Sequence, residues 1–261
     1  MPRQIPWIAT GSSTEDLPQW VDSFIERGAT HASRSISLLG VGAEELAESA
    51  KHAFIDCIDS LPGPPCRVWA FLPRPTEVEA DFLDRYMRFN IGRTNAYRSR
   101  PERISIVPAG TCVGHGGTNL CVHALHQPGP MTAVENPRQR AAWLYSKKYG
   151  PVSPAFTRGV LTNGVLLASG TAAIVGETTL HESDFPAQFA ETLCNLQSLA
   201  IAGGTSQPWR SVQIYVRDEH NLEQAEQLAH NAFGSGFERV LCAPLCRSEL
   251  LVEIEGVANI D

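Results

Sequence analysis

The dipeptide Asn163-Gly164 constrains the fold of this chain more than any other short feature of its sequence. It separates two apolar runs, Val160 to Thr162 and Val165 to Ser169. A two-residue type I′ turn needs positive φ at both central residues, and Asn followed by Gly meets that need with little strain. The sequence therefore predicts an antiparallel β-hairpin over residues 160–169.

Elements of alternating type follow the hairpin. Ser183 or Asp184 can cap a helix, Pro186 suits its first turn, and Gly203-Gly204 can end it. The predicted elements after this helix are a strand over 211–217, a helix from residue 221 and a final strand over 250–255. The resulting ββαβαβ order is typical of a two-layer α+β domain with both helices on one face of the sheet.

The first half of the chain repeats this order less cleanly. Its predicted elements are strands near 7–10 and 35–39, a helix over 44–60, a strand over 67–72, a helix after a capping box at Thr76 and Glu79, and strands over 104–107 and 119–125. We therefore expect a degenerate N-terminal domain over 1–135 and a C-terminal domain over 156–261. Residues 136–155 between them are rich in Pro and Tyr, which favours an ordered connector.

The final predicted strand places two carboxylates on one face. Period-two geometry turns the apolar residues of this strand toward the helices and leaves Glu253 and Glu255 on the other face. If that face meets another domain or subunit, burial raises the pKa of a carboxyl there, so that it can hold a proton near neutral pH and act as a general acid. The alternative is a pair of solvated glutamates on an exposed sheet.

Arg93 is predicted to lie on the apolar face of a helix. At helical spacing it shares that face with four aromatic residues, Phe82, Tyr86, Phe89 and Tyr97. A guanidinium in such surroundings needs an anionic partner. That partner is either a ligand carboxylate or a structural acid of the protein, and the sequence does not choose between them.

Arginines and tyrosines gather between residues 135 and 158. Arg138 and Arg158 flank Tyr145 and Tyr149, and prolines stiffen the chain around them. Rigidly held guanidinium and phenol groups can form a planar carboxylate site. At the end of the predicted hairpin, the small Gly170 would allow a ligand to approach closely. The alternative for both features is ordinary loop and turn chemistry.

Charge and cysteine content argue against several other classes of protein. The formal net charge of −7 disfavours general nucleic-acid binding, which needs a basic surface. No apolar run is long enough to span a bilayer, and residues 1–13 lack the pattern of a signal peptide. The odd number of cysteines, seven, favours reduced thiols and a cytoplasmic location. The Cys and His residues over 112–126 match no zinc signature and the glycines over 114–117 no nucleotide-binding motif, so we expect neither metal nor cofactor.

Six segments of the chain, in order, resemble the chorismatase family. They are residues 85–93 (RYMRFNIGR), 108–114 (PAGTCVG), 135–139 (ENPRQ), 145–158 (YSKKYGPVSPAFTR), 169–176 (SGTAAIVG) and 250–256 (LLVEIEG). The resemblance extends over roughly residues 67–261. The C-terminal half is also similar to the broader Rid/YjgF superfamily, whose last strand ends in a comparable Val-Glu-Ile-Glu pattern.

The resemblance implies an α+β fold of two Rid/YjgF-like (chorismate-mutase-like) domains, with the active site in the cleft between them. It implies chorismate as the substrate, release of pyruvate and no cofactor. Glu253 would be the catalytic acid that protonates the methylene carbon of the enolpyruvyl group. The residues that the resemblance and the residue chemistry assign to substrate binding are Arg93, Arg138, Gln139, Tyr145, Tyr149, Arg158, Gly170 and Thr171.

Family members differ in product, and Gly170 favours those that form 3-hydroxybenzoate, in some cases with 4-hydroxybenzoate. The alternative product is a non-aromatic dihydroxycyclohexadiene carboxylate. The chain departs from the family pattern at Glu177, where a histidine is usual. A carboxylate there would disfavour a dianion if it faced the pocket.

Two other functions stay open from the sequence. A Rid-type enamine or imine deaminase would need only the C-terminal half, and a non-enzymatic small-molecule binding protein could be built on the same fold. The segment from Glu135 to Arg158 lies outside a minimal Rid domain and favours the chorismate-converting enzyme. The resemblance leaves a homotrimer and a monomer equally open.

Overall fold

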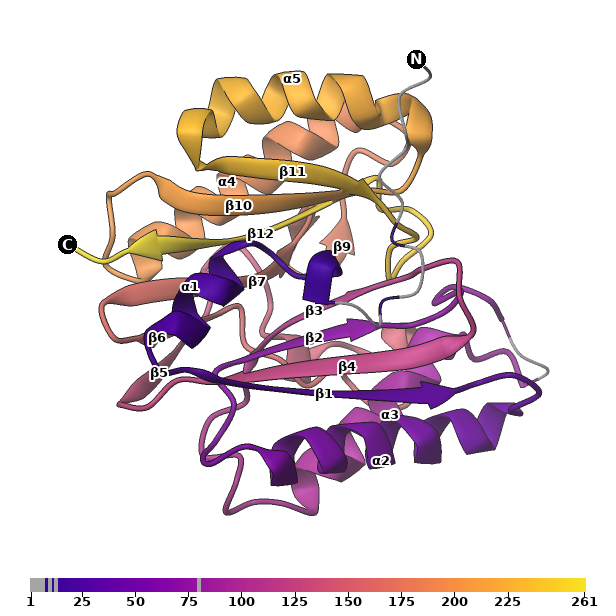
Figure 1. The fold of residues 1–261 in the computed structure, drawn as a ribbon. Coiled ribbons are helices and arrows are strands. Elements are labelled where there is room, and N and C mark those ends of the chain that lie inside the picture. The colour runs from indigo at the N-terminus through magenta and orange to yellow at the C-terminus, as the bar shows by residue number, and fades with distance from the viewer. Residues whose placement is uncertain (1–7, 9–10, 12–13, 79–80) are drawn as a thin grey trace.

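The computed structural model describes residues 8, 11, 14–78 and 81–261. The elements of the first domain are β1 (Thr30–Ser37), α2 (Ala43–Ser60), β2 (Arg67–Phe71), α3 (Arg85–Arg98), β3 (Ala109–Val113) and β4 (Asn119–His126), preceded by the short helix α1 (Trp20–Glu26). Its sheet has the order β1-β4-β2-β3. Helices α2 and α3 cover the outer face of this sheet (Figure 1).

The second domain has a larger sheet of six strands. Its elements are β5 (Met131–Val134), β6 (Gly159–Thr162), β7 (Val165–Thr171), α4 (Phe185–Ala202), β10 (Trp209–Val216), α5 (Leu222–Phe233), β11 (Phe237–Cys242) and β12 (Val252–Asn259). The strand order is β11-β10-β12-β7-β6-β5, and a separate two-stranded ribbon joins β8 (Ile174–Val175) to β9 (Thr178–Thr179). No helix among the described residues is long and apolar enough to cross a membrane.

The two domains repeat one plan. The order β1-β4-β2-β3 in the first sheet corresponds to β7-β12-β10-β11 in the second. In both, the central strand is antiparallel to its neighbours and the last pair is parallel. The described part of the first domain has no counterpart of β6. The predicted α+β fold of two related domains, with a degenerate first one, is therefore confirmed.

Most predicted elements of the second domain are present. The hairpin over residues 160–169 corresponds to β6 and β7, with Asn163 and Gly164 both at positive φ. Strand β11 was not predicted, because Glu238 and Arg239 interrupt its apolar pattern. Since β5 pairs with β6, we draw the division between the domains before residue 131 rather than at 135.

The predictions for the first domain need more correction. Helix α3 begins at Arg85, where the Asp84 side chain accepts a hydrogen bond from the Met87 amide at 2.7 Å, and not at Thr76. Phe82 therefore precedes the helix and is 88% exposed, so it does not share the face of Arg93. The proposed capping residue Glu79 and most of the strand near 7–10 lie outside the described residues.

The strands of the first domain also differ from their predicted positions. Strand β1 begins five residues before the predicted Ser35, and β3 occupies 109–113 rather than 104–107. Polar residues dominate β1, and β3 consists mostly of small residues, so the alternation of both strands is weak in the sequence. Helix α1 was missed, because it is only seven residues long.

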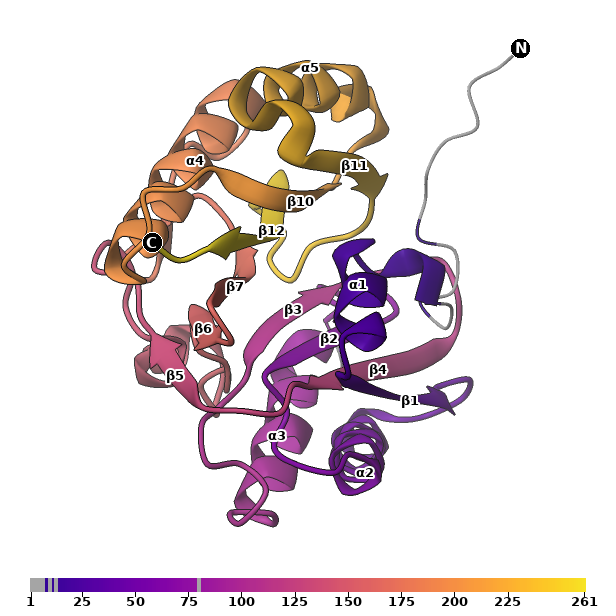
Figure 2. The ribbon, with the colours of Figure 1, turned by 60° about the vertical axis from the view of Figure 1, so that its left-hand side comes forward.

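Three apolar layers hold the fold together. One lies between the first sheet and its helices, and another lies between the second sheet and α4 and α5. The third lies between the two sheets, whose inner faces meet there (Figure 2). Trp69 of β2, Tyr215 of β10 and Val257 of β12 belong to this middle layer. The inner face of β12, which carries Glu253 and Glu255, is therefore buried against the other domain.

Close contact between α2 and α3 fixes the position of Arg93. A Cβ atom added at Gly92 would lie 2.2 Å from the Ala47 carbonyl oxygen and 2.9 Å from the Lys51 amide nitrogen. Both atoms belong to the backbone of α2 and cannot rotate away. Glycine at this position thus sets the separation of the two helices.

We predict that Gly92→Ala lowers the free energy of unfolding by about 1–3 kcal/mol, because the added methyl group must push the helices apart. Asn95→Ala on the same helix is the control, since Asn95 is exposed. Urea denaturation of both variants measures the effect. Equal stability of the two variants would contradict the conclusion that Gly92 sets the separation of α2 and α3.

Candidate active site

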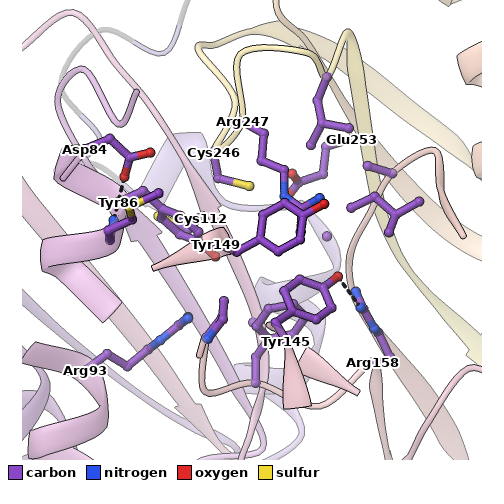
Figure 3. A pocket seen from close by; sticks show the side chains of 18 residues that line it. Asp84, Tyr86, Arg93, Cys112, Tyr145, Tyr149, Arg158, Cys246, Arg247 and Glu253 are labelled. Atoms are coloured by element: carbon purple, nitrogen blue, oxygen red, sulfur yellow. Dashed lines mark hydrogen bonds between the residues drawn. The ribbon is translucent and has the colours of Figure 1, made fainter. Parts of the chain in front are cut away.

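A cavity of about 720 Å³, measured out to open solvent, lies where the two domains meet. The first domain contributes residues of α3 and β3, and the second contributes residues of β7, β12 and the loop before β12 (Figure 3). Tyr145 and Tyr149, from the segment that joins β5 to β6, cover one side of it.

Glu253 is the buried acid of this cavity. Its side chain points inward from β12, and the residue is only 4% exposed. Burial, and after it the negative charge of Glu255, raise the pKa of the Glu253 carboxyl to about 8, against the opposing effects of Arg67, Arg158 and Arg247. Among the described residues, none forms a hydrogen bond with this carboxyl. It can therefore hold a proton at neutral pH and turn it toward a ligand.

Gly170 lies directly against the Glu253 carboxyl. A Cβ atom built at Gly170 would stand 1.9 Å from Oε1 of Glu253, so only glycine fits beside the acid in this position. The backbone there is irregular, because the pairing of β12 with β7 shifts register between Ile254 and Gly256. Such bulges re-aim side chains next to active sites.

Three arginines reach the cavity, and each is held by neutral groups. Arg158 donates to the Tyr145 hydroxyl at 2.7 Å and to the Arg140 carbonyl at 2.9 Å. The guanidinium of Arg247 lies 3.9 Å from the ring centroid of Tyr149. Arg93 donates to the Asn90 side chain.

No carboxylate in the described part of the chain forms an ion pair with Arg93, Arg158 or Arg247. The other acidic residue that lines the cavity is Asp84, which caps α3. With Glu253 protonated, three positive charges face one negative charge. The cavity therefore suits a ligand with two negative charges, since such a ligand would supply the missing partners.

Five of the predicted binding residues line this cavity, and three do not. Arg93, Tyr145, Tyr149, Arg158 and Gly170 surround it together with Glu253. The other three point elsewhere. Arg138 forms an ion pair with Glu191, Gln139 donates to the Ile174 carbonyl, and Thr171 donates to the Ser169 carbonyl. These side chains hold their own segments together, and Arg138, Gln139 and Thr171 are not among the residues that line the cavity; their predicted role in substrate binding stays a prediction.

Glu177 also points away from the cavity. Its carboxylate accepts hydrogen bonds from the Ser146 amide at 2.9 Å and from Arg140 at 3.3 Å. These bonds to Ser146 hold its pKa below the usual value. The repulsion of a dianion considered for this position therefore does not arise.

Several other residues that line the cavity carry little signal in the sequence. Arg247 lies in the loop between β11 and β12, where no periodicity marks its direction. Tyr86 was placed correctly on the face of Arg93 but was not connected with the cavity. Cys112 and Cys246 also line it, and burial raises the pKa of the Cys246 thiol to about 12, which keeps it neutral.

The fold and the cavity define a two-domain α+β protein with an arginine-lined cavity between its domains. A model of the N-terminal part of FkbO/Hyg5-like chorismatases matches residues 28–126. A 3-hydroxybenzoate synthase of Streptomyces hygroscopicus is 31% identical over 212 residues, which cover 73% of this chain and 62% of the relative. A chorismatase of Streptomyces rapamycinicus is 30% identical over 73% of this chain and 63% of its own length.

Solved structures agree with these relatives. A chorismatase crystal structure superposes with a TM-score of 0.76 and 25% identity, covering 88% of this chain and 74% of the other. The Rid-family protein YyfA of Yersinia pestis aligns with 50% of the chain at a TM-score of 0.40. The chain is thus similar to chorismatases over most of its length. It spans less than two thirds of the length of the curated relatives it matches.

The buried acid predicts a pH-dependent stability. A carboxyl whose pKa rises from 4.5 in the unfolded chain to about 8 in the fold favours folding below pH 4.5, and this advantage is lost as the pH rises toward 8. We predict that Glu253→Gln gains stability relative to the native protein between about pH 5 and 8, by on the order of a few kcal/mol. Denaturant titrations at both pH values measure the difference. A constant difference would show that Glu253 is ionised throughout.

Proposed function

We propose that this protein is an enzyme that converts chorismate and releases pyruvate, with Glu253 as the catalytic acid. The observation that supports this most directly is a buried, protonated carboxyl in a cavity with three arginines that lack a carboxylate partner. Chorismate brings two carboxylates and an acid-labile enol ether. The cavity thus offers a counter-charge for each carboxylate and a proton for the ether.

The positions of the arginines support a definite way of binding. Arg93 lies on the side of the first domain, whereas Arg158 and Arg247 lie across the cavity on the side of the second (Figure 3). Each side can take one carboxylate of the substrate. The enolpyruvyl group must then lie beside Glu253, and the rings of Tyr145 and Tyr149 can lie along the cyclohexadiene ring.

The chemistry begins when Glu253 transfers its proton to the methylene carbon of the enolpyruvyl group. A methyl group forms, and the adjacent ether carbon becomes an oxocarbenium centre with positive charge. Loss of a ring proton with rearrangement then gives a hydroxybenzoate and pyruvate, which together contain the same atoms as chorismate. Addition of one water instead gives pyruvate and the dihydroxycyclohexadiene carboxylate. A proton returned to Glu253 completes either route.

We favour 3-hydroxybenzoate as the product, with 4-hydroxybenzoate as a second product. The supporting observations are Gly170 beside the acid and a relative named 3-hydroxybenzoate synthase at 31% identity. An imine deaminase of the Rid type is less well supported, since Arg93, Tyr145 and Tyr149 lie outside the minimal Rid domain. One chain supplies residues from both domains to the cavity, which favours a monomer over a trimer with shared sites.

The first test is incubation of the purified protein with chorismate. We expect pyruvate, detected with a lactate dehydrogenase couple, and 3-hydroxybenzoate, identified by chromatography. Glu253→Gln should lower the rate by at least about 100-fold, because it removes the proton donor. Glu223→Gln is the matched control, since Glu223 is exposed on α5, and it should keep the native rate. Absence of pyruvate above the spontaneous background would refute the proposal.

A second prediction concerns Gly170. In Gly170→Ala the new methyl group must displace the Glu253 carboxyl, because the two would stand 1.9 Å apart. We expect a larger share of the non-aromatic diol or a loss of kcat of about tenfold or more, since an acid that moves away from the ether protonates it less well. Chromatography of the ring products measures both. An unchanged product ratio and rate would contradict the importance of this contact.

A further inference from the structure

Glu255 is fully buried between the two sheets, yet it carries a complete set of hydrogen-bond donors. Arg67 of β2 forms an ion pair with it, and Trp69 of the same strand donates to Oε2 at 2.7 Å. The Tyr215 hydroxyl donates to Oε1, and the Thr111 hydroxyl donates to Oε2 at 3.2 Å. Every group that contacts this carboxyl donates to it, which favours its ionised form.

The same network reaches the backbone beside the catalytic acid. The Thr111 hydroxyl, which donates to Glu255, accepts hydrogen bonds from Arg67 and from the Gly170 amide, the latter at 3.0 Å. Gly170 in turn lies against the Glu253 carboxyl. Glu253 and Glu255 project from the same face of β12, about 7 Å apart along the strand. The charge of Glu255 thus lies at a fixed place near the acid.

We propose that Glu255 is a positioning residue whose fixed negative charge keeps the proton on Glu253 until the substrate takes it. This inference rests on the proposed function and assigns the second glutamate of the strand its own part in it. Arg67 neutralises Glu255 only in part, since the charge of Glu255 still raises the pKa of the Glu253 carboxyl. Ionisation of Glu253 would put two negative charges on one face of a buried strand.

The other charged and titratable groups near Glu253 do not replace this effect. Arg67, Arg158 and Arg247 all favour the ionised acid, so they oppose Glu255. Tyr86, Cys112 and Cys246 are neutral, because burial raises the pKa of each. Among the charges that shift the pKa of this acid, Glu255 is therefore the one that favours the proton.

The test compares Glu255→Gln, which removes the charge, with Tyr215→Phe, which removes one donor and leaves both charges in place. Infrared difference titration follows the protonated carboxyl band of Glu253, assigned by its loss in Glu253→Gln. We expect Glu255→Gln to lower the titration midpoint by about one pH unit or more, and Tyr215→Phe to leave it nearly unchanged. The alkaline limb of kcat/KM for pyruvate release should move down with the midpoint.

An unchanged midpoint in Glu255→Gln, or an equal shift in Tyr215→Phe, would overturn the inference, because a purely structural network predicts no effect of charge. If Glu255→Gln does not fold, the double variant Glu255→Gln with Arg67→Met removes both charges and should shift the midpoint down by a smaller amount. In the native protein, loss of the protonated Glu253 band already at about pH 6 would also overturn the inference. The infrared result needs no turnover, so failure on chorismate would refute only the proposed reaction.

Discussion

The burial of two sheet faces against one another is the constraint on which the rest of this structure depends. Apolar residues alone would suit such a buried face, yet the inner face of strand β12 carries two carboxylates. Glu255 is compatible with burial because Arg67 and three further donors meet it. A buried ion pair adds little to stability when compared with apolar residues of similar size. The cavity beside the pair of Arg67 and Glu255 therefore explains its presence better than stability does.

Glu253 is buried by the same contact but receives no such donors. Two glutamates separated by one residue therefore differ in their surroundings. An arginine and three hydrogen-bond donors meet the Glu255 carboxyl, whereas burial raises the pKa of Glu253 so that it keeps its proton. Pairs of titratable groups whose environments separate them in this way are typical of acid–base catalysis.

The periodicity of strands and helices was enough to predict from the sequence which faces carry these side chains. The alternation along β12 placed both glutamates on the open face of the sheet, and helical spacing placed Arg93 and Tyr86 on one side of α3. Arg138 and Arg247 could not be assigned in this way. Both lie in loops, where direction depends on local partners: Glu191 draws Arg138 outward, and the Tyr149 ring holds Arg247 over the cavity. The start of α3 was missed for a similar reason, because Asp84 caps it in the structure.

The internal repeat also explains why the described chain has a single site of this kind. Strand β4 holds the place in the first sheet that β12 holds in the second, and its inner face carries His123. Burial lowers the pKa of His123 to about 4, so the ring is neutral, and it stacks on His31. Its Nε2 lies 2.9 Å from the Gly11 carbonyl oxygen, which belongs to the N-terminal segment. Histidine rings and the Gly11 backbone thus lie on this face of β4, where β12 carries its carboxylates. The first domain provides the wall, Arg93 and the partner of Glu255, while the acid itself comes from the second.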